Sequence, residues 1–389
     1  MSSTDEFDDI TADDLREQGS LKWTKYGGDT IGAFVAEMDF GVAPPIAKAL
    51  HAAVERATFG YLPPALRAGL AASCARWYER RYGWSVDPAT VIPITDVLTG
   101  FTLVMEHFTR PDSPIILPTP AYMPFRSIPP RHGRRIIEVP MILDGDRYVM
   151  DLDGIDRAYR AGGHLLVLCN PHNPTGRVFT ADELGGVTEV VDRHGGLVFS
   201  DEIHAPLTYP GHRHVPYAST SDTAAAHTVT ATSASKAWNL PGLKCGQLIV
   251  TAALDGASAA ERLGDLVEYG ASTLGAIANA AAYHSGRRWL DDVLGYLNGN
   301  RLALRDLLGK FLPQIRYTPP EATYLAWLDC RDLGVADPAA FLLDAAGIAV
   351  VDGAQCGEAG RGYVRFTFAT PRPILEQAVA RLAQAVATR

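Results

Sequence analysis

Cysteine pairs and long apolar runs are scarce in this sequence. Its 389 residues include five cysteines, an odd number, widely spaced and without a Cys-x-x-Cys pair. Neither a disulfide framework nor a zinc knuckle is therefore expected, and no metal site is predicted. No run approaches the roughly 18 apolar residues of a membrane-spanning helix. Because residues 1–14 are acidic and lack the features of a secretory signal, we expect a soluble, cytoplasmic protein.

An excess of positive charge is also missing. The formal net charge is -9 and the pI is near 5.7. Nucleic acids and anionic membranes require clustered cations, so neither is an expected partner. With 47% hydrophobic and 20% charged residues, the chain can bury a large core. Its length exceeds that of most single domains, which predicts two of them.

Short apolar runs alternate with helix-like stretches in the middle of the chain. Their residues are rich in β-branched types, and Gly, Pro or polar clusters bound each run. Continuous rather than alternating hydrophobicity favours strands covered on both faces, in a mainly parallel sheet of an α/β domain. The predicted strands cover residues 115–117, 135–139, 165–169, 197–200, 228–230 and 247–250.

Helical spacing brackets this region and leads into a second apolar pattern. Helices are predicted from Pro44, over 66–82, and through most of 252–312. The tail predicts a small second sheet and a closing helix, over 324–328, 349–351, 363–368 and 374–386. Residues 1 to about 20 are predicted to form a mobile acidic arm. We assign residues 46–288 to a large domain, and residues 1–45 with 289–389 to a small one.

One lysine stands in a loop suited to a phosphorylated ligand. Lys236 follows Ser233 and Ser235 and precedes a Gly-containing loop that ends in Lys244. Hydroxyls, backbone N–H groups and a cation in one loop suit a phosphate dianion, and the amine can form an imine with an aldehyde. Taken alone, the segment is also compatible with an ordinary surface loop.

Two further polar segments follow predicted strands. Asp201 directly follows the predicted strand 197–200. At that position a carboxylate can pair with a protonated ring nitrogen or cap a helix. Asn173 follows the strand 165–169; it either shapes a turn or donates to a phenolate oxygen, with His204 as a neighbour. Together with Lys236, these strand-end residues provide what pyridoxal 5'-phosphate needs, and they predict that cofactor.

Over residues 20–386 the chain resembles the fold-type I, aspartate aminotransferase-like family of pyridoxal-phosphate enzymes. Within that family it is similar to the cystathionine β-lyase, or C–S lyase, group of the MalY/PatB type. The resemblance implies a seven-stranded-type, mainly parallel sheet sandwiched by helices, plus a smaller α+β domain. The segments that carry it are 22–26 (KWTKY), 34–40 (FVAEMDF), 59–61 (FGY), 118–125 (PTPAYMPF), 170–176 (NPHNPTG), 200–204 (SDEIH), 231–239 (ATSASKAWN), 286–290 (GRRWL), 321–329 (EATYLAWLD) and 362–366 (GYVRF).

The resemblance also implies roles for residues that the motifs alone do not assign. Tyr122 is expected to stack on the pyridine ring, and Tyr61 to reach the phosphate across a homodimer interface. Arg365 is expected to bind the substrate α-carboxylate as a planar bidentate donor, with the loop at Ala36 beside it.

The phosphate end departs from the family pattern at two positions. The resemblance places the backbone of Val97 and Leu98 at the phosphate, at the start of a helix. Asp96 precedes them where related lyases often carry glycine, and an acid beside a phosphate has no explanation from the sequence. Lys244 stands where many relatives have arginine, which keeps the charge without the fork geometry.

The resemblance implies a carbon–sulfur β-lyase that uses Lys236 as general base. Its substrate would be cystathionine or a cysteine S-conjugate, and its products a thiol, pyruvate and ammonia. An aminotransferase shares the early steps and is the alternative. A regulatory protein that retains the cofactor site is a further reading from a different functional class.

Overall fold

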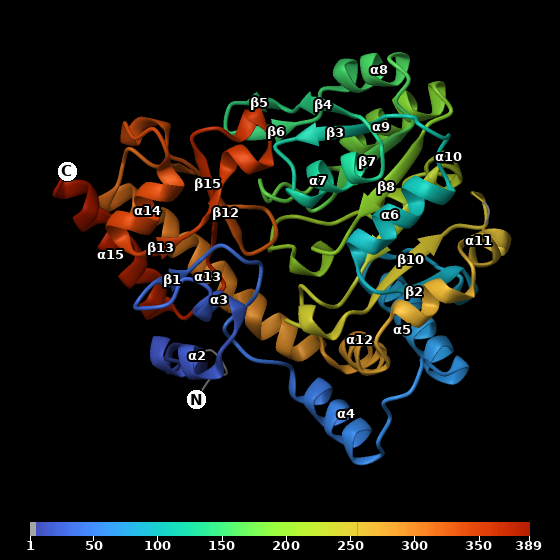
Figure 1. Cartoon of the computed structure of the whole chain (residues 1–389), viewed down its shortest axis with the longest axis horizontal. Helices are drawn as coiled ribbons and strands as arrows, with labels where there is room; N and C mark the ends of the chain where they lie inside the picture. The colour runs from blue at the N-terminus through green and yellow to red at the C-terminus, as the bar shows by residue number, and fades with distance from the viewer. Residues whose placement is uncertain (1–4, 255) are drawn as a thin grey trace.

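A seven-stranded sheet forms the centre of the larger part of the computed structural model, which describes residues 5–254 and 256–389. Its strand order is β2-β10-β9-β8-β7-β3-β4 (Figure 1). Neighbours from β9 to β4 pair in parallel, and β10 runs antiparallel to both of its neighbours. The strands are β2 (Val91–Ile94), β3 (Ile115–Thr119), β4 (Ile136–Pro140), β7 (Leu165–Cys169), β8 (Leu197–Asp201), β9 (Thr228–Thr232) and β10 (Gly246–Val250).

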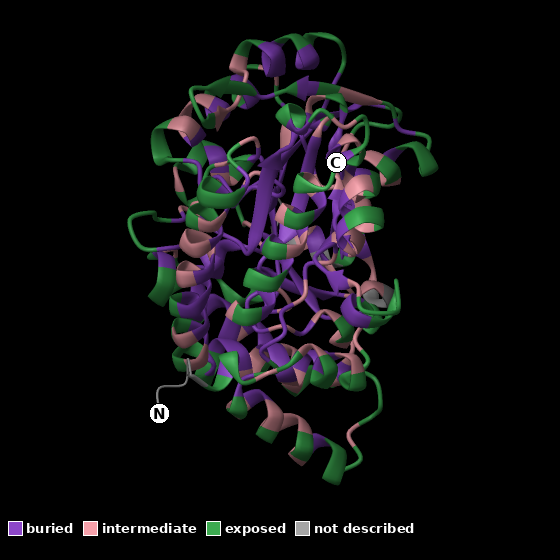
Figure 2. Ribbon diagram, turned by 90° about the vertical axis from the view of Figure 1, so that its left-hand side faces the viewer, coloured by how far each residue is buried: buried purple, intermediate pink, exposed green. Residues whose placement is uncertain are grey.

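Helices cover both faces of this sheet, as the continuous apolar runs predict. Along β7, Leu165 and Val167 join one buried cluster, whereas Leu166 and Leu168 join another. Because side chains alternate across a strand, each face has its own core. In Figure 2 the buried strands lie inside a shell of partly exposed helices. The helices of this part are α4 (Pro44–Glu55), α5 (Pro64–Tyr82), α6 (Val97–His107), α7 (Pro124–Arg131), α8 (Leu152–Arg160), α9 (Ala181–Arg193), α10 (Asp222–Ala226), α11 (Gly256–Leu263) and α12 (Thr273–Ser285).

Strand β2 is the one strand of the large sheet that the sequence did not predict. Pro93 interrupts its apolar run and has no N–H to donate. The strand tolerates this proline because it lies at the edge of the sheet and pairs only with β10, where Pro93 faces Gln247.

A smaller antiparallel sheet, ordered β11-β12-β15-β14, forms the second part of the molecule. The predicted tail strands lie in it or beside it, and the predicted closing helix is α15 (Arg372–Ala387). The other elements of this part are α13 (Arg287–Phe311), β11 (Arg316–Tyr317), β12 (Leu325–Asp329), α14 (Pro338–Ala346), β13 (Ile348–Ala349), β14 (Val351–Asp352) and β15 (Tyr363–Thr367). A separate hairpin of β5 (Ile142–Asp144) and β6 (Arg147–Val149) lies in the chain portion of the larger part. The two sheets occupy the chain portions assigned above to separate domains, and the boundaries near 45 and 288 stay predictions.

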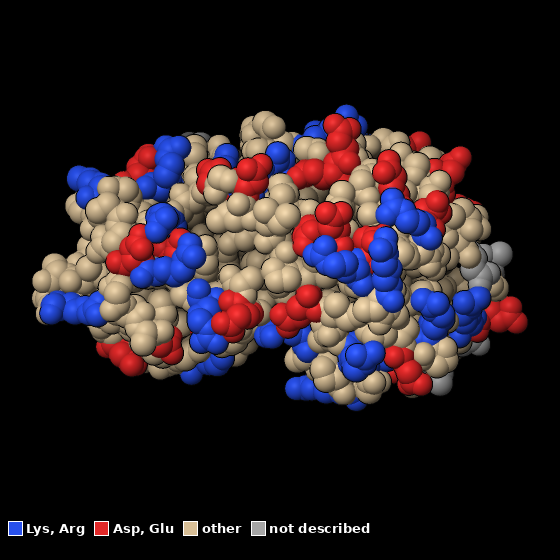
Figure 3. All heavy atoms as spheres, turned by 90° about the horizontal axis from the view of Figure 1, so that it is seen from above, with Lys and Arg blue, Asp and Glu red and all other residues tan. Residues whose placement is uncertain are grey.

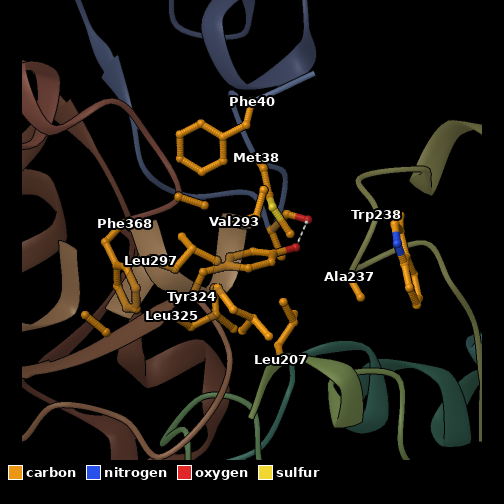
Figure 4. Packing of buried hydrophobic residues seen from close by; sticks show 14 of the residues in the cluster. Met38, Phe40, Leu207, Ala237, Trp238, Val293, Leu297, Tyr324, Leu325 and Phe368 are labelled. Carbon is orange, nitrogen blue, oxygen red and sulfur yellow. Dashed lines mark hydrogen bonds between the residues drawn. The ribbon is translucent and has the colours of Figure 1, made fainter. Parts of the chain in front are cut away.

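The N-terminal segment packs with the second part. Strand β1 (Ile31–Gly32) pairs in parallel with β13. Figure 4 shows Met38 and Phe40 of the same segment in one apolar cluster with Tyr324 and Phe368. The segment therefore completes a core that the C-terminal residues begin.

The prediction of a mobile arm at the N-terminus is wrong for the residues that the structure describes. Residues 5–24 form α1 (Asp5–Asp8), α2 (Ala12–Gln18) and α3 (Leu21–Thr24), and residues 1–4 lie outside the described part. Phe7 and Leu15 are buried, and the Phe7 ring lies 4.8 Å from that of Phe40. Two apolar anchors outweigh the acidic composition that suggested mobility.

Charged side chains of both signs are interspersed on the face shown in Figure 3. Within the described ranges, no helix combines the length and apolarity needed to cross a bilayer.

A buried ion pair ties the N-terminal segment to the end of β15. The Lys22 ammonium donates to Asp39 Oδ2 at 2.7 Å and to the carbonyl oxygen of Ala369 at 3.0 Å. The Trp23 indole donates to Asp39 Oδ1 at 2.9 Å. Both charged side chains are almost completely buried, at 2% and 5% exposure for Lys22 and Asp39. Each charge therefore depends on the other for compensation.

We expect Asp39→Ala to lower the free energy of unfolding by about 3–5 kcal/mol, because it leaves the buried Lys22 ammonium unpaired. Urea denaturation of the variant and the native chain measures the difference. The double variant Lys22→Met/Asp39→Leu removes both charges and should recover most of the loss. A single variant as stable as the native chain would contradict the assignment.

Candidate active site

A cleft of about 390 Å³ lies beyond the carboxyl ends of β7 and β8, with walls from both parts of the molecule. This is the edge at which parallel sheets bind ligands. Segments far apart in the sequence meet here. The predicted site residues that line it are Ala36, Val97, Leu98, Tyr122, Asn173, Asp201, His204, Ser235, Lys236, Lys244 and Arg365.

Lys236 lies in the turn that follows β9 and points into the cleft. Its ammonium donates to the carbonyl oxygen of Ala36 at 3.0 Å. Desolvation, reinforced by the positive charge of Arg365, lowers the pKa of Lys236 to about 8. About a tenth of the amine is therefore neutral, and nucleophilic, at pH 7, far more than for an ordinary lysine.

Asp201 is the last residue of β8, and its carboxylate is 4% exposed. The backbone N–H of Ile203 donates to Oδ1 at 3.1 Å, and the Cys169 thiol lies 3.9 Å from Oδ2. Within the described residues Asp201 makes no ion pair. Burial raises the pKa of Asp201 to about 7, so a cation brought into the cleft would stabilise its charged form.

Arg365 enters the cleft from β15 of the smaller sheet and is 2% exposed. One terminal nitrogen donates to Asn173 Oδ1 at 3.1 Å, and the other donates to the carbonyl oxygen of Phe34 at 2.8 Å. Its Nε has no partner among the described residues. A buried guanidinium with spare donor capacity suits a carboxylate ligand.

The hydrogen bonds of Asp96 explain why an acidic residue stands at the predicted phosphate end of the cleft. Asp96 caps α6: its Oδ1 accepts from the backbone N–H of Thr99 at 2.9 Å. Its Oδ2 accepts from the Lys244 ammonium at 3.0 Å, so the two departures from the family pattern pair with each other. Ser235 lines the cleft beside them. The start of α6, a cation and a hydroxyl thus line the same cleft.

Two predicted residues lie outside this cleft. The Ser233 hydroxyl donates to the carbonyl oxygen of Cys245 at 2.7 Å and accepts from the N–H of Ser235 at 3.0 Å. The Ser233 hydroxyl therefore stabilises the loop, and its direct contact with the phosphate stays a prediction. Tyr61 is 81% exposed and lies near Tyr269, with ring centroids 5.3 Å apart. Its contact across a dimer stays a prediction.

Sequence reasoning missed several residues that the structure brings to the site. The Tyr324 hydroxyl donates to the carbonyl oxygen of Ala36 at 3.0 Å, and a dashed line marks a hydrogen bond of Tyr324 in Figure 4. The Lys236 amine donates to the same oxygen. Lys25, Tyr26 and Met123 line the outer cleft. Tyr324, Lys25, Tyr26 and Met123 all lie in segments that carry the family resemblance, which was the available signal.

Residues 35–382 match the family described as aminotransferase class I and II. The chain belongs to this family. Its fold is the fold-type I arrangement, and it is an enzyme. The cystathionine β-lyase of Corynebacterium glutamicum is 38% identical over 95% of this chain and 98% of that protein.

A further relative and a solved structure extend the comparison. The cystathionine β-lyase PatB of Bacillus subtilis is 30% identical over 94% of this chain and 96% of its own length. Cystalysin from Treponema denticola, whose crystal structure contains pyridoxal 5'-phosphate, is 27% identical. The alignment covers 97% of this chain and 98% of cystalysin, with a TM-score of 0.89. The match therefore spans both parts of the fold.

Proposed function

We propose that this chain is a pyridoxal-phosphate-dependent carbon–sulfur β-lyase. The observation that carries the proposal is the meeting of Lys236, Asp201 and Arg365 in one cleft. Cystathionine or a cysteine S-conjugate is the substrate class, and a thiol, pyruvate and ammonia are the products. The names of the relatives support this choice over transamination.

The residues of the cleft fit pyridoxal phosphate. The Lys236 amine is available for a covalent bond to an aldehyde, and the buried Asp201 makes no ion pair with any described residue. The start of α6, Ser235 and Lys244 would hold the phosphate. Two buried nitrogens have no partner among the described residues: Arg365 Nε, a donor, and His204 Nδ1, a donor or acceptor. Both leave hydrogen-bonding capacity for a polar ligand.

When bound, the cofactor draws electron density from the α-carbon of an amino acid. Asp201 would keep the ring nitrogen protonated, because a buried carboxylate favours a cationic neighbour. Arg365 would orient the α-carboxylate, and Tyr122 would cover one face of the ring. Lys236 Nζ, once free, would remove the α-proton as general base. The thiolate leaves from the β-carbon, and water completes the conversion to pyruvate and ammonia.

Incubation with single substrates separates lyase from aminotransferase, the second activity that the family name supports. With L-cystathionine alone, the lyase should release a thiol and pyruvate in equal amounts. Ellman's reagent measures the thiol, and coupled lactate dehydrogenase measures the pyruvate. Product formation only when an amino donor is supplied with a 2-oxo acid would replace the proposal with transamination.

The pH dependence of cofactor capture tests the environment of Lys236. The rate at which the cofactor-free protein binds pyridoxal phosphate should rise with pH and level off above a midpoint near 8, because the neutral amine attacks the aldehyde. Stopped-flow absorbance gives the rate. The reaction of free Nα-acetyl-lysine under the same conditions is the control, and an identical midpoint for both would contradict desolvation at Lys236.

We infer a homodimer with shared active sites. Tyr61 follows α4, which protrudes from the molecule (Figure 1), and Phe59, Tyr61 and Tyr269 are exposed there. A second copy of the chain would bury these rings. A mixture of Tyr61→Ala and Lys236→Ala chains should regain activity, because each hybrid then holds one intact site. Failure to regain it, or a monomeric mass in solution, would refute the shared site.

The five unpaired cysteines support a cytoplasmic location.

A further inference from the structure

One cation of the cleft has no role in the proposed chemistry. Four basic side chains line the cavity: Lys25, Lys236, Lys244 and Arg365. Lys236 is assigned to the cofactor aldehyde, Lys244 to the phosphate and Arg365 to the α-carboxylate. Asp96 already pairs with Lys244. Lys25 is therefore surplus to the cofactor and to the amino-acid end of the substrate.

Lys25 is exposed, and two aromatic rings hold it at the cleft. Its ammonium lies 4.8 Å from the ring centroid of Phe34 and 5.2 Å from that of Tyr26. The two rings meet edge to face, with centroids 5.2 Å apart. Within the part of the chain that the structure describes, Lys25 makes no ion pair. The rings fix its position while leaving the positive charge uncompensated.

The outer wall of the cleft beside Lys25 is mostly apolar. Phe34, Met123, Val350 and Val351 line it, and the exposed side chain of Gln355 adds one amide. Such a wall suits methylene groups and sulfur, with a polar group only at the far end of the chain. An unpaired ammonium beside that wall favours an anion at the same end.

We propose that Lys25 binds a carboxylate at the distal end of the leaving group, so that the preferred substrates are thioether amino acids whose thiol product carries a carboxylate. This assignment rests on the proposed lyase function and specifies its substrate class. L-Cystathionine meets the requirement, since its leaving group carries a carboxylate. A neutral S-alkyl-cysteine leaves Lys25 without a partner.

A matched substrate pair isolates this contact. S-(2-carboxyethyl)-L-cysteine and S-propyl-L-cysteine have leaving groups of similar size and differ in charge. Lys25→Met keeps the side-chain stem over the rings and removes the cation. It should lower kcat/KM for the carboxylate substrate about tenfold, mainly by raising KM, because one charged hydrogen bond is lost. The same variant should change kcat/KM for S-propyl-L-cysteine less than about twofold.

Two further variants control the measurement. Lys25→Arg keeps the cation and should retain the preference for the carboxylate substrate. Lys310→Met removes another exposed lysine that lies over an aromatic ring, that of Phe311, outside the cleft lining; it should change neither substrate. High salt should weaken the preference of the native enzyme and leave that of Lys25→Met unchanged.

The outcomes separate this assignment from the function on which it rests. Equal losses on both substrates, no loss on either, or a weaker affinity of Lys25→Met for pyridoxal phosphate would overturn the role of Lys25 and leave the lyase intact. A native enzyme that releases no thiol from cystathionine or from either S-conjugate would overturn the lyase and this assignment with it.

Discussion

Replacing Lys236 with alanine should reduce thiol release from L-cystathionine by about 10³-fold or more, because one side chain provides both the covalent bond and the general base. Its amine points into the cleft at 3.0 Å from the carbonyl oxygen of Ala36. Lys244, another lysine of the cleft, is engaged with Asp96. The loss should therefore appear in kcat.

Borohydride reduction and intact mass measurement distinguish loss of the covalent bond from loss of the fold. The native enzyme should retain the mass of one cofactor after reduction, whereas Lys236→Ala should not. Lys310→Ala, outside the cleft lining, should behave as the native enzyme. Thiol release by Lys236→Ala at the native rate would refute the role assigned to this lysine.

Asp201→Asn should have opposite effects on activity and on the stability of the cofactor-free protein. Without a carboxylate at the ring nitrogen, kcat/KM should fall by about 10²- to 10³-fold. The amide keeps the shape of the side chain and can still accept from the N–H of Ile203. It also removes the cost of a buried charge, so the cofactor-free variant should be more stable than the native chain above pH 7.

Burial raises the pKa of Asp201 from 3.8 to about 7, and this shift determines whether the substitution stabilises or destabilises the cofactor-free protein. A carboxyl group with a raised folded-state pKa stabilises the fold fully below its unfolded pKa of about 3.9, and this contribution is lost as pH rises to about 7. The difference amounts to about 4 kcal/mol, from roughly three pKa units at about 1.4 kcal/mol each. Urea denaturation of both cofactor-free proteins at pH 5 and pH 8 measures the part lost over that interval, about 3 kcal/mol from roughly two pKa units. Equal stability at pH 8 would show that Asp201 is not desolvated.

The sequence predicted the larger sheet well because its strands are buried on both faces. Such strands read as continuous apolar runs, as in Leu165–Cys169, whatever their neighbours are. The N-terminal segment was harder. Its acidic residues resemble a mobile arm, and only the packing of Phe7 and Leu15 against distant residues shows that it is ordered.

Within the site, the sequence predicted which residues take part but not which of them contact one another. Lys236, Asp201 and Asn173 each follow a strand, and parallel strands end at a common edge, so their convergence could be predicted. The partner of Asp96 could not be predicted, because Lys244 lies 148 residues after Asp96 in the chain. The same holds for the bond between Arg365 and Asn173, which joins the two sheets.

The sequence by itself determined the α/β class, the order of the strands along the chain and the candidate cofactor residues, since these depend on local periodicity and side-chain chemistry. The tertiary structure alone decided that Ser233 bonds to Cys245, that Asp96 and Lys244 form a pair, and that Lys25 lies at the cleft without an ion pair among the described residues. Those properties depend on distances between segments remote in sequence and on the removal of water around them, and neither leaves a local pattern in the chain.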